Sequence, residues 1–328
     1  MKWSLIPTLL FALPLSVANA TDTQYPVTVD NCGSPLIIDK RPVRAVVHDI
    51  NMSEMAFALG LQDNMVGVTG ITGWYKMSPS FNQKLGDIPE LAPKYPSLER
   101  LIAAETDFFF AGWNYGMKVG GEVTPQTLKP YGISTLVLSE SCIHTQKNNN
   151  GASMALLYDD IKKLGVIFDK QSEAETLVKD WKARVKKVTE NGTDNTSTPP
   201  TVFLYDSGED KPFTAGKYAM PNAMIEAAGG RSITGNMETS WGRTSWENVA
   251  REDPEVIILL DYQTASGADS LQHFLEQHPL MKHTKAVTSG RYVKLRYEQL
   301  TPGPANIGAI EKLAKAFIPQ QEKRQLTD

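Results

Sequence analysis

The sequence predicts an α/β protein of two lobes, each with a mainly parallel sheet, joined by one long rigid helix. Strand and helix signals alternate in both halves of the chain, which is typical of parallel sheets covered by helices. Between the halves, residues 170–190 carry one apolar stripe, enough for a helix roughly 30 Å long. Residues 97–110 and 245–258 repeat one pattern without a gap, a capped helix followed by an apolar strand, so the lobes are expected to be similar.

Residues 1–20 have the composition of a secretory signal peptide. Lys2 gives a positive start, residues 5–15 are apolar, and residues 18–20 are the small-residue pattern that signal peptidase accepts. We expect cleavage after Ala20 and no lipid anchor, because no cysteine follows the apolar core. No later run reaches the roughly 20 apolar residues that a membrane span needs, so a soluble, exported product is expected.

Composition and motifs exclude several classes of protein. The 328 residues are enough for two cores, and a net charge of −4 argues against a nucleic-acid partner. The chain has no Gly-x-Ser-x-Gly, His-Glu-x-x-His, P-loop or Gly-x-Gly-x-x-Gly motif. An exported hydrolase is the main enzyme alternative, and these absences lead us to expect binding without catalysis.

The first lobe is assigned to residues 21–165. It opens with a hairpin, because two short β-prone runs flank a turn-rich segment at residues 30–34. Alternating signals then predict, in order, strand 44–48, helix 53–59, strand 65–68, helix 97–105, strand 107–111, helix 122–131, strand 133–139 and helix 152–164. Gly60 and Gly132 end two of these helices.

The connecting segment is assigned to residues 166–192, and the second lobe to residues 193–328. A polar break at residues 193–200 separates the long helix from the renewed alternation. The second lobe is predicted to contain strand 201–205, helix 221–228, helix 245–252, strand 256–260, helix 270–278, strand 291–295 and helix 306–317. The repeated Ser-x-Glu helix therefore occurs once in each lobe.

The chain has two cysteines, Cys32 in the predicted hairpin and Cys142 just after a strand of the same lobe. Export favours a disulfide between them. Two buried free thiols are the alternative, because the sequence does not give their separation.

The order of these features resembles the class III, or helical-backbone, periplasmic substrate-binding proteins of ABC importers, the iron-siderophore and cobalamin type. The resemblance rests on residues 44–48 leading into 53–60, on the strand at Gly67-Val68, on both Ser-x-Glu helices and on residues 290–294. It implies two α/β lobes joined by one rigid helix, with the ligand in a groove between them.

The resemblance gives the twin glutamates a role. In similar proteins one acidic residue on each lobe docks onto arginines of the permease, and the matching positions here are Glu99 and Glu247. The alternative is local, because a glutamate in a first helical turn also complements the helix dipole.

Ligand contacts are expected in the loops that follow the strands, where parallel α/β sheets bind their ligands. Flat aromatic side chains suit a large ring or a catecholate, and arginines suit anionic chelate oxygens. The candidates are Trp74, Tyr75, Trp113, Tyr115, Tyr218, Trp241, Arg243, Arg296 and Tyr297. A surface salt bridge is the alternative for each arginine.

Two histidines suggest an alternative site, which would bind a metal ion directly. His48 and His144 each follow a strand of the first lobe, and with Asp206 or Asp261 they could bind a bare transition metal. They could instead reach the metal of a bound chelate. A packed or surface histidine is the alternative for each.

The resemblance thus predicts a monomeric periplasmic protein that delivers an iron-siderophore, or a similar metal chelate, to an ABC permease dimer with its ATPase subunits. No cofactor is required, and metal is expected only as part of the ligand. The alternatives are cobalamin, haem, an anionic cofactor, or a divalent metal held directly by His48 and His144.

Overall fold

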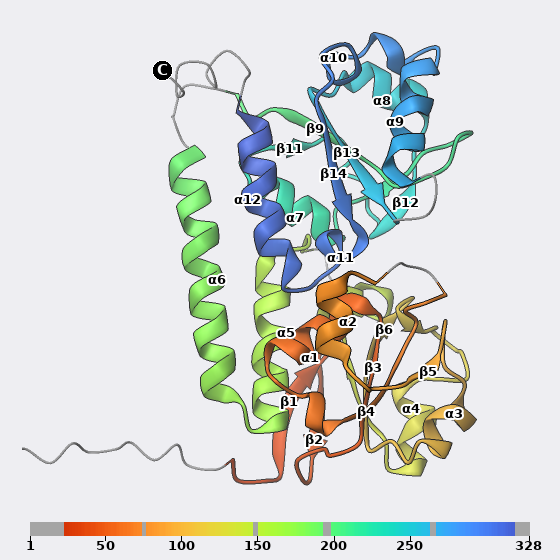
Figure 1. The fold of residues 1–328 in the computed structure, drawn as a ribbon, viewed down its shortest axis with the longest axis vertical. Helices are drawn as coiled ribbons and strands as arrows, with labels where there is room; N and C mark the ends of the chain where they lie inside the picture. The colour runs from red at the N-terminus through yellow and green to blue at the C-terminus, as the bar shows by residue number, and fades with distance from the viewer. Residues whose placement is uncertain (1–22, 74–76, 147–149, 193–197, 263–266, 319–328) are drawn as a thin grey trace, which may run out of the picture.

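The computed structural model describes residues 23–318 except 74–76, 147–149, 193–197 and 263–266. Two lobes lie one above the other, and a long helix runs along one side of both (Figure 1). The predicted signal peptide, Trp74 and Tyr75 fall outside the described residues. None of the helices in the described part has both the length and the apolar character that a bilayer crossing requires.

The first lobe is built on a parallel sheet with strand order β5-β4-β3-β6-β7, in which β8 also pairs with β6. Its strands are β3 (Ala45–His48), β4 (Met65–Thr69), β5 (Glu90–Ala92), β6 (Phe108–Trp113), β7 (Gly116–Met117) and β8 (Ser134–Val137). Its helices are α1 (Ile50–Ala58), α2 (Pro79–Leu85), α3 (Leu98–Ala103) and α4 (Pro125–Leu128), with a 3-10 helix η3 (Ser139–His144). The antiparallel hairpin β1 (Val27–Asn31) and β2 (Ser34–Ile38) precedes them.

The second lobe repeats this plan with fewer strands. A parallel sheet has the order β11-β9-β13-β14, and a separate antiparallel pair joins β10 to β12. The strands are β9 (Thr201–Tyr205), β10 (Phe213–Ala215), β11 (Arg231–Ser232), β12 (Trp241–Arg243), β13 (Val256–Asp261) and β14 (Tyr292–Arg296). The helices are α7 (Met220–Ala227), α8 (Trp246–Glu252), α9 (Gly267–Gln277), α10 (Lys285–Thr288), α11 (Tyr297–Leu300) and α12 (Ala305–Phe317).

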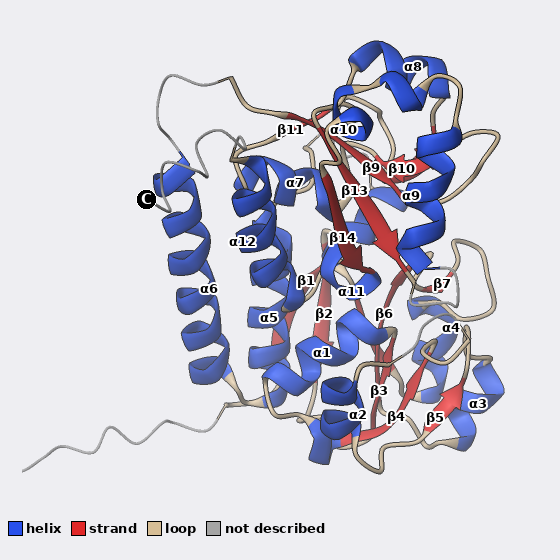
Figure 2. Ribbon diagram, turned by 45° about the horizontal axis from the view of Figure 1, so that its top comes forward, coloured by secondary structure: helices blue, strands red, loops and turns tan. Residues whose placement is uncertain are grey.

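The long helix is α6 (Gln171–Gly192), close to the predicted residues 170–190. Its buried residues Ala174, Val178 and Trp181 belong to the core that also contains α5 (Met154–Phe168). At the other lobe, Arg184 forms two hydrogen bonds of 2.8 and 2.9 Å with Glu311 of α12. Helix α6 therefore contacts both lobes along its length (Figure 2).

The main helices and strands lie close to their predicted positions, and the differences have local causes. The helix expected over residues 122–131 is only α4 followed by a 3-10 turn, because Pro125 starts it late and Pro130 cannot donate a helical hydrogen bond. Elements α2, β5, β10 and β12 were not predicted, since segments this short carry no clear periodicity.

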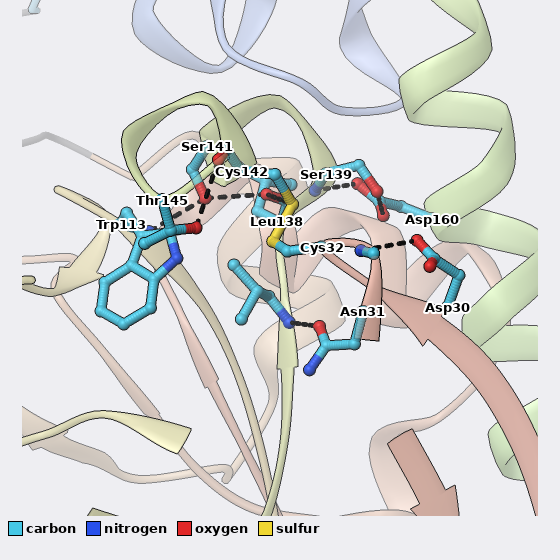
Figure 3. The surroundings of a disulfide bond; sticks show 12 residues. Asp30, Asn31, Cys32, Trp113, Leu138, Ser139, Ser141, Cys142, Thr145 and Asp160 are labelled. Atoms are coloured by element: carbon cyan, nitrogen blue, oxygen red, sulfur yellow. Dashed lines mark hydrogen bonds between the residues drawn. A yellow bond between two sulfur atoms is a disulfide. The ribbon is translucent and has the colours of Figure 1, made fainter. Parts of the chain in front are cut away.

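A disulfide between Cys32 and Cys142 joins the N-terminal hairpin to η3 (Figure 3). Next to it, Asn31 donates to the Thr135 carbonyl (2.9 Å) and accepts from the Val137 amide (2.8 Å). The hairpin is therefore attached covalently to η3 and by hydrogen bonds to β8.

Removing the disulfide is expected to destabilise the first lobe. The bond spans 110 residues, so the reduced chain regains a long flexible loop when it unfolds. A Cys32→Ser, Cys142→Ser double variant should lose about 2–5 kcal/mol of unfolding free energy, measured by urea denaturation. An unchanged midpoint and slope would show that the hairpin is held by Asn31 and packing alone.

Candidate functional site at the lobe interface

The carboxyl ends of strands from both lobes face each other across the lobe interface. Asp49 follows β3 of the first lobe and Tyr297 follows β14 of the second. The Tyr297 hydroxyl donates to Asp49 Oδ2 at 2.9 Å, and nearby Asn51 Nδ2 donates to the Pro302 carbonyl at 2.7 Å. This edge of a parallel sheet is where α/β proteins bind ligands, and here it is shared by two sheets.

The lobes are also joined by a second set of hydrogen bonds, which converges on Glu140 of η3. Trp241 Nε1, from β12, donates to the Tyr115 hydroxyl of the first lobe at 3.1 Å. That hydroxyl donates in turn to Glu140 Oε2 at 3.2 Å. Glu140 Oε1 accepts from the backbone N–H of Met220 in the second lobe. One carboxylate of η3 therefore connects both lobes.

The second lobe contributes a further tyrosine–carboxylate pair. The Tyr262 hydroxyl donates to Asp206 Oδ2 at 2.8 Å, and the Tyr262 ring stacks near Tyr297 with centroids 6.1 Å apart. In the same lobe, the Phe213 ring stacks on the Trp241 ring, with centroids 6.1 Å apart. The interface is thus formed by aromatic rings, and the hydroxyls of Tyr115, Tyr262 and Tyr297 donate to carboxylates.

The interface carboxyl groups are buried next to neutral donors. Asp49 and Glu140 are each 3% exposed, and their donors are tyrosine hydroxyls and backbone N–H groups. Burial raises the pKa of Asp49 and of Glu140 to about 7 each. Both groups therefore change charge near neutral pH.

Three of the predicted ligand residues meet at this interface: Tyr115, Trp241 and Tyr297. Tyr218 lies nearby, with Glu140, in the lining of a cavity of about 290 Å³ beside the disulfide. The Tyr218 hydroxyl donates to Glu238, and the Lys217 ammonium lies over its ring at 5.4 Å. Whether these side chains contact ligand stays a prediction.

Trp113 lies in the core, contrary to the expectation of an exposed contact. It is 6% exposed and packs in a cluster with Leu101 and Phe109. Alternation along β6 explains this, because Phe109 and Trp113 point to one face of the sheet and Phe108 and Phe110 to the other. The surrounding glycines had suggested a loop, but β6 extends through Trp113.

The two predicted arginines are engaged locally. Arg243 donates to the Lys211 carbonyl at 2.7 Å and lies over the Phe213 ring at 5.6 Å. Arg296 pairs with Glu298 in the next helix. Arg296 thus forms a salt bridge, the kind of contact that was its alternative, whereas the partners of Arg243 are a carbonyl and a ring. Because both side chains already have local partners, the expected anionic contact has little support in the geometry.

His48 is packed rather than presented to the interface. It is 1% exposed, and its Nδ1 lies 2.8 Å from the Thr69 hydroxyl. Its ring is enclosed by Gly70 and Gly116, where a Cβ atom would approach ring atoms to 2.3 and 2.6 Å. Burial lowers the His48 pKa to about 3, so the ring is neutral. This position matches the packed alternative and argues against a metal ligand.

His144 lies at the end of η3, where its Nε2 is 3.3 Å from Asn114 Nδ2. Partial burial lowers its pKa. Among the residues that the structure describes, no three His, Cys, Asp or Glu side chains come together as a metal site. The histidines therefore do not form the proposed direct metal centre within this part of the chain.

Two residues with hydrogen bonds across the interface, Asp49 and Glu140, have no role predicted from the sequence. In the sequence, only their position indicates a site, because each follows shortly after a strand of the first lobe. Their partners lie 248 and 80 residues away, so no local pattern could have revealed the pairing.

The raised pKa of Glu140 predicts a pH-dependent contribution to stability. The folded protein binds this proton more tightly than the unfolded chain, so the contribution favours folding as pH falls below about 7. Relative to Glu140→Gln, which cannot ionise, the wild type should gain about 1–2 kcal/mol between about pH 8 and about pH 5.5. Denaturation of both proteins across this range checks it, and effects of buried histidines cancel in the difference. A difference that is constant or of opposite sign would contradict the assignment.

Comparison with known proteins identifies the family. The family model for periplasmic binding proteins matches residues 46–298. The chain is 24% identical over 302 residues to an uncharacterized ABC transporter substrate-binding lipoprotein of Bacillus subtilis (strain 168), covering 91% of this chain and 88% of the relative. It is 23% identical over 301 residues to a cobalamin-binding protein of Halobacterium salinarum, covering 89% and 74%. The crystal structure of an ABC-type Fe3+-hydroxamate transport system from Saccharomonospora viridis has a TM-score of 0.75, 22% identity and coverage of 90% of this chain and 100% of that chain. The match covers most of the sequence, and the chain therefore belongs to the periplasmic binding protein family, in the class III type that serves ABC importers.

Proposed function

We propose that this protein captures an iron-siderophore, or a similar metal chelate, between its lobes and delivers it to an ABC permease with its ATPase subunits. The observation that carries the proposal is that Tyr115, Trp241 and Tyr297 all take part in hydrogen bonds that cross the lobe interface. Aromatic faces with satisfied polar tips suit a large, flat or ring-shaped ligand. In keeping with this role, the chain is expected to be exported and cleaved after Ala20 and to act as a monomer.

Cobalamin and haem remain the alternative cargoes. The cobalamin-binding relative supports the first, and the Fe3+-hydroxamate structure supports a siderophore. An anionic cofactor has weaker support because Arg243 and Arg296 are already paired locally. A bare divalent metal has weaker support still, since His48 is enclosed and neutral.

Tryptophan fluorescence titration tests this proposal directly. Ferrioxamine B, haemin and cyanocobalamin should be compared with free divalent metals. We expect saturable quenching by at least one chelate, reduced in Trp241→Phe because that indole lies at the interface. The matched control is Trp181→Phe, which removes a buried indole of α6 outside the interface. Saturation only by free metal, or quenching unaffected by Trp241→Phe, would overturn the proposal.

We further propose that Glu99 and Glu247 contact the permease. Each lies exposed in the first turn of its helix, α3 or α8, and each helix is capped by the preceding serine, Ser97 or Ser245. Hydrogen bonds from its own backbone N–H and that serine lower the pKa of each glutamate, so both stay ionised. Helices α3 and α8 lie in different lobes on the side away from α6 (Figures 1 and 2). Two fixed charges, one on each lobe, would orient the protein on a symmetric partner.

Charge reversal separates docking from binding. A Glu99→Arg, Glu247→Arg variant should bind cargo within about twofold of wild type, yet lose about tenfold or more of uptake in a reconstituted transport assay. The matched control is Glu175→Arg, Glu190→Arg, which reverses two charges on α6. Normal uptake by the first variant, or equal loss by the control, would remove the docking assignment.

A further inference from the structure

We propose that Glu140 is the positioning residue of the lobe interface: it holds α7 of the second lobe and, through Tyr115, the indole of Trp241 against the first lobe. The inference rests on the proposed function only in treating Tyr115 and Trp241 as cargo contacts. The structural part concerns the protein without cargo and can be tested alone.

The first contact of Glu140 completes a helix of the other lobe. Helix α7 begins after Ala219, which has no side chain able to cap it. Glu140 Oε1 accepts the N–H of Met220, the first residue of α7. A carboxylate is the preferred acceptor at a helix N-terminus, because it satisfies a free N–H group and complements the dipole. The first lobe thus supplies the cap that the second lobe lacks.

The second contact of Glu140 orients the side chains of Tyr115 and Trp241, which together are called the aromatic wall below. Trp241 Nε1 donates to the Tyr115 hydroxyl, which donates to Glu140 Oε2. Each donor in this series points toward Glu140. The Glu140 carboxylate, as the final acceptor, therefore fixes the orientation of the tyrosine hydroxyl and of the indole. Trp241 also stacks on Phe213, which extends the effect to β10.

Glu140 can act in this way because η3 is firmly held. The disulfide at Cys142 lies two residues further on, and the Ser139 amide donates to Asp160 of α5 at 3.0 Å. The Ser141 hydroxyl accepts from the Trp113 amide at 2.9 Å and donates to the Leu138 carbonyl at 2.7 Å (Figure 3). The residues on both sides of Glu140 are therefore anchored to the first lobe.

Three variants of the cargo-free protein test the two contacts separately, with two readouts. Amide exchange of Met220, followed by NMR, reports the cap. The emission of Trp241, taken as the difference from the matching Trp241→Phe protein, reports the aromatic wall. Glu140→Ala should speed Met220 exchange by about tenfold or more and shift the Trp241 emission, because it removes both contacts.

The other variants separate the contacts. Tyr115→Phe should shift the Trp241 emission and leave Met220 protected, because the cap remains. Glu140→Gln should keep Met220 protected, since the amide oxygen can still accept its N–H. The control is Asp159→Ala, which removes an exposed carboxylate from the lining of the same cavity and should change neither readout.

The proposal is overturned if folded Glu140→Ala leaves Met220 exchange unchanged, or if Tyr115→Phe leaves the Trp241 emission unchanged. If Glu140→Ala fails to fold, Tyr115→Phe and Glu140→Gln still decide it, because a general loss of structure would not separate the two readouts. With the chelate that quenches the wild type, Glu140→Ala should bind about tenfold or more weakly. Glu140→Gln should recover only part of this loss, because its amide oxygen can accept from Met220 while its NH2 group cannot accept from Tyr115. If no chelate binds the wild type, the proposed function fails while the cargo-free readouts still judge Glu140.

Discussion

The hydrogen bond from Met220 to Glu140 is the constraint at the centre of the proposed interface, beside those of Tyr297 with Asp49 and of Asn51 with Pro302. It joins a helix of one lobe, which has no cap of its own, to a carboxylate of the other lobe. Removing one partner of a buried hydrogen bond leaves the other unsatisfied, at a cost of about 1–3 kcal/mol. The lobes are thereby placed relative to each other by a directional contact as well as by apolar packing.

A continuous helix also connects the two lobes. Helix α6 runs along both lobes and is tied to α12 by the paired hydrogen bonds of Arg184 with Glu311. One side of the protein is therefore held by a continuous helix, and the facing surfaces are held by hydrogen bonds among buried groups. Under the proposed function, cargo that binds between the lobes would replace some of these hydrogen bonds with its own, and α6 would keep its contacts.

Much of the fold could be predicted from the sequence, because the signals are local. Apolar runs mark the central strands, Ser97 and Ser245 cap their helices, and the apolar stripe of residues 170–190 predicts α6. The paired cysteines were consistent with a disulfide in an exported chain, and the structure contains it.

The site was harder to predict for two physical reasons. The direction of Trp113 depends on where β6 ends, and its alternation sends that ring into the core. The roles of Asp49 and Glu140 depend on donors from the other lobe, which only the folded chain brings near. Tyr115, Trp241 and Tyr297 were chosen from the sequence and lie at the lobe interface, and their contact with ligand stays a prediction. Arg296 pairs with Glu298 close in sequence, and Arg243 lies over the Phe213 ring of the adjacent strand β10.

Hydrogen–deuterium exchange with and without a saturating chelate is the most direct test of whether cargo binds where the two lobes meet. We expect added protection in the segments around Tyr115, Glu140, Met220, Trp241 and Tyr297, with little change in α6 and in the exposed helices α3 and α8. Protection confined to surfaces away from the interface, or no change at saturation, would contradict the claim.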